Sequence, residues 1–210
     1  MSKREDFPSL TTKTSIINRS LSKIIRRRDW AKFRKLLSSK EILIAQCDSS
    51  SDPHNHFGGI LLLACRYDPP TDIIALLINE NPSALYETCG DNRFPLHVAC
   101  ANGASSHVIK QLLEANKEAT YQRDKHGMLP IHIACRHEFS GAWRPEDISS
   151  YESQVQTLKY LIKAAPDTLL EVDENGKCSI EHALESGTHI DIIRSLQDIN
   201  QKIQRAISKS

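Results

Sequence analysis

The stretch Phe94-Pro-Leu-His-Val-Ala-Cys100 decides the fold, because it recurs as Leu129-Pro-Ile-His-Ile-Ala-Cys135. A related stretch, Gly59-Ile-Leu-Leu-Leu-Ala-Cys65, precedes both of them. The alanine near the end of each copy follows the previous one after 35 residues. A fixed period of this length indicates a stack of similar structural units, since one such unit cannot bury its apolar face alone.

A later copy is Cys178-Ser-Ile-Glu-His-Ala-Leu184. Its alanine, Ala183, comes 49 residues after Ala134, which is one period plus a 14-residue insertion. We place this insertion at residues 139–152, between the two helices of the fourth unit. Ser149 to Glu152 has the pattern of a capping box and predicts that the second helix starts there.

The second half of each unit carries pairs of apolar residues four positions apart, as in Ile73-Ile74 and Leu77-Ile78. This spacing makes one apolar stripe along a helix. Asn81-Pro82 and Ala165-Pro166 follow the stripe and predict its end, because proline cannot supply the next backbone donor. Each unit is therefore a helix, a turn, a second helix and a loop.

A weaker copy over residues 14–47 completes an all-α solenoid of about five helix-turn-helix units, with short hairpin-like loops between them. We expect residues 1–13 to form a flexible basic arm and residues 14–210 to form one repeat domain. The units are predicted near 14–47, 54–88, 89–123, 124–172 and 173–200, followed by a C-terminal capping helix.

These residues resemble the ankyrin repeat family. The best match is Asp124-Lys-His-Gly127 followed by Pro130-Ile-His-Ile-Ala134, and Asp173-Glu-Asn-Gly176 opens the fifth unit in the same way. The resemblance covers roughly residues 14–200. The chain departs from the family in its period of 35 residues and at two motif positions. Leu62 and Glu181 replace the histidine, and Phe94 and Leu129 replace the threonine.

Two pairs, His97 with Cys100 and His132 with Cys135, have a spacing that could supply half of a zinc site. Equivalent helices in stacked units lie about 8–10 Å apart, too far for their ligands to converge on one ion. We therefore interpret the histidines as hydrogen-bonded to backbone and the cysteines as buried apolar residues. A second loose cluster consists of Cys47, His54 and His56.

No nucleophile has a recognised catalytic context, and no glycine has the spacing of a phosphate-binding loop. We expect no cofactor, no metal and no enzymatic activity. The resemblance implies a non-catalytic scaffold or adaptor that binds a partner protein through hairpin tips and the concave face of the first helices. The residues expected to contact the partner are Arg66, Tyr67, Asp91, Arg93, Asn102, Lys125, His126, Met128, Arg136, His137 and Trp143.

Within this set, Arg66, Arg93 and Arg136 are expected to form one row across successive units, together with a tyrosine and a histidine beside them. Arginine and tyrosine often dominate binding energy at interfaces. The alternative is an ordinary solvated surface. For Trp143 the alternative to a binding anchor is that it folds back and packs on the fourth helix pair.

The net charge of +1 hides a division along the chain. Residues 1–40 hold 12 Lys+Arg and three Asp+Glu, a balance of +9, and the remaining residues carry −8. Arg26, Arg27 and Arg28 lie in the basic part and suggest an alternative function, an adaptor for nucleic acid or an anionic surface. They could also line the solvent side of a capping helix, because Ile16, Ile17, Leu21, Ile24 and Ile25 form an apolar stripe beside them.

No apolar run reaches the length of a membrane-spanning helix, and the first residues do not resemble a secretory signal. Six cysteines without such a signal favour reduced thiols inside the cell. We therefore expect an intracellular monomer, in the cytoplasm or the nucleus.

Overall fold

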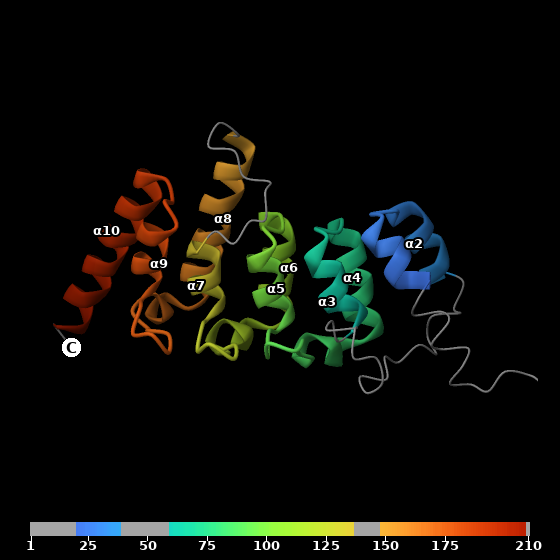
Figure 1. The fold of residues 1–210 in the computed structure, drawn as a ribbon, viewed down its shortest axis with the longest axis horizontal. Coiled ribbons are helices and arrows are strands. Elements are labelled where there is room, and N and C mark those ends of the chain that lie inside the picture. Colours follow the sequence, from blue (N-terminus) through green and yellow to red (C-terminus); the bar gives the residue numbers. More distant parts are fainter. Residues whose placement is uncertain (1–19, 39–58, 137–147, 209–210) are drawn as a thin grey trace, which may run out of the picture.

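The computed structural model describes residues 20–38, 59–136 and 148–208. Within these ranges the chain forms helix pairs that stand side by side in one row, with α2 near one end and α10 at the other (Figure 1). The predicted all-α solenoid of helix-turn-helix units is confirmed. Its helices are residues 20–26 and α2 (Trp30–Ser38), α3 (Ile60–Arg66) and α4 (Thr71–Glu80), α5 (Pro95–Ala101) and α6 (Ser106–Ala115), α7 (Pro130–Cys135) and α8 (Ile148–Ala164), and α9 (Ser179–Glu185) and α10 (Ile190–Ile207).

Proline marks the starts of helices in this chain. Pro95 and Pro130 occupy the first positions of α5 and α7, where the fixed φ suits a helix and the missing N–H is not needed. After the second helix, where the sequence predicts only a loop, a short 3₁₀ helix follows in three units. These are η1 (Pro82–Tyr86), η2 (Lys117–Tyr121) and η3 (Pro166–Leu169).

The units pack through equivalent helices. The first helix α5 contacts α3 and α7, and the second helix α6 contacts α4 and α8. Ala64 and Ala99 have no exposed surface and Ala134 is 4% exposed, as expected for small residues where helices approach closely. The described parts of all five units contribute to one hydrophobic core.

We expect Ala99→Leu to lower the free energy of unfolding by roughly 1–3 kcal/mol, because extra methylene groups at a close-packed helix contact force neighbouring side chains apart. Urea unfolding measures this change. Ala115→Leu, at an exposed position of α6, is the matched control. Equal stability of Ala99→Leu and the wild type would contradict the close helix contact.

The prediction of a separate C-terminal capping helix after residue 200 is wrong. α10 runs unbroken from Ile190 to Ile207. Ile199 and Ile203 pack against the core, so the apolar stripe of the fifth unit's second helix continues past residue 200.

The predicted start of α8 at a Ser149 cap is also wrong, since α8 already includes Ile148. With 17 residues, α8 is longer than α6, which has 10. The last residues of the insertion therefore extend the second helix of the fourth unit, and residues 137–147 lie outside the described residues.

Candidate functional site

Asp124 shapes the hairpin-like loop that opens the fourth unit. One carboxylate oxygen, Oδ1, accepts hydrogen bonds from the backbone N–H groups of His126 at 2.8 Å and Met128 at 3.0 Å. The other, Oδ2, accepts from Nε of Arg93 at 3.0 Å. The Asp124 side chain has no exposed surface, so this buried carboxylate depends on all three donors.

Asp173 does the same in the fifth unit. Its Oδ1 accepts from the N–H groups of Asn175 at 2.8 Å and Lys177 at 3.0 Å, and Oδ2 lies 3.0 Å from Nε2 of His182. Burial by itself would raise the pKa of Asp173, but these donors outweigh it and lower the pKa to about 2.

Backbone hydrogen bonds join the tips of successive loops. Lys125 N–H donates to the carbonyl of Asp91 at 2.9 Å, and Glu174 N–H donates to the carbonyl of His126 at 3.3 Å. The Lys125 ammonium also pairs with the Asp91 carboxylate, a hydrogen bond that lowers the pKa of that carboxyl group. The tips of the third, fourth and fifth units thus form one continuous row.

Two buried histidines tie the first helices to the loops between units. Nδ1 of His97 accepts from the N–H of Phe94 at 3.3 Å, and Nε2 lies 3.2 Å from the carbonyl of Met128 and donates to it. His132 makes the same two kinds of bond at 3.1 and 2.9 Å. Burial lowers the pKa of His97 to about 4 and also lowers that of His132. The interpretation of these histidines as structural is confirmed, since backbone groups occupy both ring nitrogens.

The cysteines Cys65, Cys100 and Cys135 occupy one repeat position, and all three are buried. Burial raises the pKa of the Cys65 thiol to about 12 and raises those of the other two as well. A thiol that stays protonated and buried is a poor nucleophile and a poor metal ligand. Among the residues that the structure describes, no three His, Cys, Asp or Glu side chains lie close enough to hold a metal ion.

A second set of predicted contact residues follows the C-terminal ends of the first helices. Arg66, Asn102 and Arg136 are exposed there, and Tyr67 is half-buried against the core. The Asn102 side chain donates to the carbonyl of Val98 at 2.8 Å and so also ends α5.

The family model of ankyrin repeats matches residues 61–143, in three copies. Over these residues the chain consists of ankyrin repeats. Ankyrin repeats are in general protein–protein interaction modules and are typically non-catalytic scaffolds. A search of curated proteins found no match to the chain. No helix in the described part of the chain is long and apolar enough to cross a membrane.

Two of the predicted contact residues are not exposed in the structure. Met128 is buried, with 1% exposed surface, because its N–H bonds to Asp124 and draws the residue into the core. Nη1 of Arg136 lies 3.6 Å from the Met128 sulfur and covers it. Arg93 is largely buried beside Asp124, so it holds the hairpin rather than facing solvent.

The predicted single row of arginines is therefore wrong. Arg93 belongs to the hairpins at the N-terminal ends of the first helices, whereas Arg66 and Arg136 lie at their C-terminal ends. A first helix such as α5 has 7 residues. At 1.5 Å per residue it separates the two sets by about 10 Å.

Several residues predicted from the sequence lie outside the described residues. These are the contact residues His137 and Trp143 and the loose cluster of Cys47, His54 and His56.

Arg123 was not among the predicted residues, but it ties the fourth and fifth hairpins together. Its Nη1 donates to the carbonyls of Gly127 at 2.7 Å and Val172 at 2.8 Å, and Nη2 bonds to Glu171 at 2.6 Å. No local pattern predicts this contact, because the insertion separates the partners by nearly 50 positions. The exposed Tyr86 and Tyr121 were also missed, although their spacing of one period marks them as equivalent.

Proposed function

We propose that this chain is a non-catalytic scaffold that binds a partner protein through its hairpin tips and the exposed ends of its first helices. The observation that carries the proposal is the continuous row of hairpin tips. Backbone bonds between Lys125 and Asp91, and between Glu174 and His126, hold exposed polar side chains of successive units at fixed positions. A preorganised surface of this kind loses little conformational entropy when it binds.

The C-terminal ends of the first helices add the residue type that most often dominates interface energetics. Arg66 and Arg136 are both exposed and stand two periods apart, so one partner could contact the second and fourth units together.

We propose that the five predicted units, residues 14–210, form one such binding domain behind the arm at 1–13. The shared hydrophobic core of the described units supports a single domain.

We expect the combined change Arg66→Ala and Arg136→Ala to weaken binding of a captured partner about ten-fold or more, which is typical of losing two interface arginines. Calorimetric titration gives the affinity, and thermal unfolding should show that the double variant remains folded at the temperature of the titration. Arg194→Ala on α10 is the matched control, since it removes an exposed arginine from the far end of the stack. Unchanged affinity in the double variant would move the binding surface elsewhere.

Arg26, Arg27 and Arg28 favour a second candidate function, because all three are exposed on the first unit. Such a cluster could bind nucleic acid or another anionic surface. Affinity for an oligonucleotide should then fall steeply with salt and disappear when the three arginines are replaced by alanine. Absence of oligonucleotide binding at low salt would exclude this candidate for nucleic acid.

We also place the scaffold inside the cell. The five described cysteines form no disulfide with one another, which suits a reducing compartment.

A further inference from the structure

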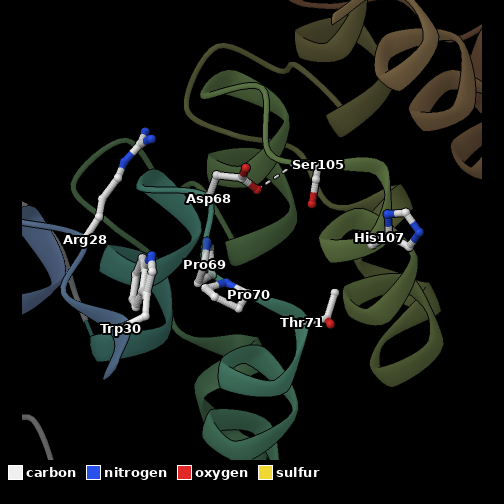
Figure 2. A pocket seen from close by; sticks show the side chains of 8 residues that line it. All are labelled: Arg28, Trp30, Asp68, Pro69, Pro70, Thr71, Ser105 and His107. Atoms are coloured by element: carbon white, nitrogen blue, oxygen red, sulfur yellow. Dashed lines mark hydrogen bonds between the residues drawn. The ribbon is translucent and has the colours of Figure 1, made fainter. Parts of the chain in front are cut away.

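An open groove of about 620 Å³ crosses the turns between the two helices in the first three units (Figure 2). These turns lie at the C-terminal ends of the first helices, so the groove is at the end of the stack away from the hairpin tips. It includes none of the hairpin-tip residues and neither Arg66 nor Arg136, but it shares Arg28 with the basic cluster of the first unit.

The groove has an apolar lining made of rings. Trp30, Pro69 and Pro70 line it together. Trp30 is half-buried and packs edge-on against Phe33, with ring centroids 6.0 Å apart, so its indole is held in place. Rigid aromatic and proline rings offer good contacts to the apolar or proline side chains of an extended peptide.

One wall of the groove is fixed before any ligand binds. The Asp68 carboxylate accepts a hydrogen bond from the N–H of Ser105 at 2.8 Å, which joins the turns of the second and third units. Arg28 lines the groove from the first unit and is exposed (Figure 2). Within the described residues, no hydrogen bond or ion pair holds its guanidinium.

The backbone angles of Arg28 and Asp68 indicate a role for their side chains. Arg28 and Asp68 have φ values of 54° and 48°, and each is the second residue after a first helix. Gly103 and Gly187 stand at the same place in the third and fifth units, with φ values of 61° and 69°. Helices commonly end with glycine in this left-handed conformation, because a side chain is disfavoured there. The first two units thus carry groove-lining side chains where glycine would suit the fold better.

The charge around the groove selects the ligand. Arg26, Arg27, Arg28 and Lys32 are exposed on the first unit, and Asp29 is the acidic residue among its described positions. An acidic ligand would therefore be attracted. The Asp68 carboxylate stands in the opposite wall and would repel a continuous phosphate backbone, while a peptide can place an apolar residue there.

We propose that this groove binds an acidic, extended segment of a partner protein. Acidic side chains contact Arg28 and its neighbours, and an apolar or proline side chain lies against Trp30 and Pro70. This surface is separate from the hairpin tips, so it provides a second contact for the same partner or for another one.

Fluorescence anisotropy of a labelled acidic peptide tests the proposal. In this peptide, glutamates flank one proline and one leucine. Glutamine in place of glutamate gives the matched neutral probe, and a labelled single-stranded oligonucleotide gives the nucleic-acid probe. In a full chain carrying Trp143→Phe, Trp30 is the remaining tryptophan, so its emission reports directly on the groove. We expect the acidic peptide to bind and change this emission, and the neutral peptide to bind more weakly.

The deciding variant is Arg28→Gly. This variant should keep or raise the thermal unfolding temperature, because glycine adopts the left-handed backbone conformation without strain. It should lower the affinity for the acidic peptide about five-fold, as expected for the loss of one exposed charge contact. Lys125→Ala, at a hairpin tip, should leave the affinity for the peptide unchanged, even if it lowers the affinity for a partner that binds the hairpin tips.

Three results would overturn the proposal. One is equal affinity for the acidic and neutral peptides, and another is equal affinity of Arg28→Gly and the wild type. The third is binding of the oligonucleotide without binding of the acidic peptide, which would assign the basic cluster to nucleic acid instead.

Discussion

Asp124→Ala should lower the free energy of unfolding by about 3 kcal/mol, the largest loss that we expect from a single substitution in the hairpins. The change removes a buried acceptor from two backbone N–H groups and leaves the Arg93 guanidinium without its carboxylate. Buried donors left without a partner carry the full cost of desolvation. Urea unfolding followed by circular dichroism measures the loss.

Two controls sharpen this prediction. Asp124→Asn keeps an oxygen that can accept the backbone N–H groups and removes only the charge facing Arg93, so its loss should be smaller. Asp198→Ala removes an exposed aspartate from α10 and should change stability little. If Asp124→Ala were as stable as Asp198→Ala, the hairpin would not depend on the buried carboxylate.

Stability should fall as the pH drops from about 6.5 to about 4, because of the buried histidines. The pKa of His97 is lowered by burial from its ordinary value of 6.5 to about 4. Between these values the unfolded chain binds a proton that the folded chain does not, so acid favours unfolding. A difference of this size corresponds to about 3 kcal/mol in the free energy of unfolding at the low end of the window.

The lowered pKa of His132 adds a further loss of stability as the pH falls. Asp173 affects stability only at a pH below the range of the histidines. The pKa of Asp173 is lowered to about 2, so its contribution is lost only as the pH falls from its ordinary value of 3.8 towards 2. Urea unfolding at a series of pH values separates the two ranges.

His97→Gln removes one titrating group while keeping an amide that can donate to the Met128 carbonyl. We expect lower stability at neutral pH and a clearly flatter dependence between pH 6.5 and 4. His107→Gln, at an exposed position of α6, should keep the wild-type slope. A wild-type slope in His97→Gln would show that this histidine is not the titrating group.

The sequence predicted the features that depend on local pattern. The recurring alanine and cysteine positions identified buried residues, because each copy packs against its neighbour in the same way. The histidine of the repeated stretch was predicted to bond to backbone, and it does so in His97 and His132. Helix ends before Pro82 and Pro166 followed from the missing proline N–H.

The features that the sequence did not predict depend on contacts between distant residues. Met128 and Arg93 looked like exposed tip residues, but the carboxylate of Asp124 draws one into the core and pairs with the other. The groove brings together turns of three units, and its strained residues Arg28 and Asp68 are recognisable only once their backbone angles are known. Repeat spacing alone cannot show which side chains remain accessible.

Affinity capture with the intact chain tests the central claim most directly. Wild-type protein and the Arg66→Ala, Arg136→Ala variant would be used to capture proteins from a lysate after nuclease treatment, with quantification by mass spectrometry. We predict at least one protein that the wild type retains and the double variant loses several-fold, while both baits remain folded at the temperature of the capture. Release of every captured protein by nuclease, or equal retention by both baits, would contradict the proposed scaffold function.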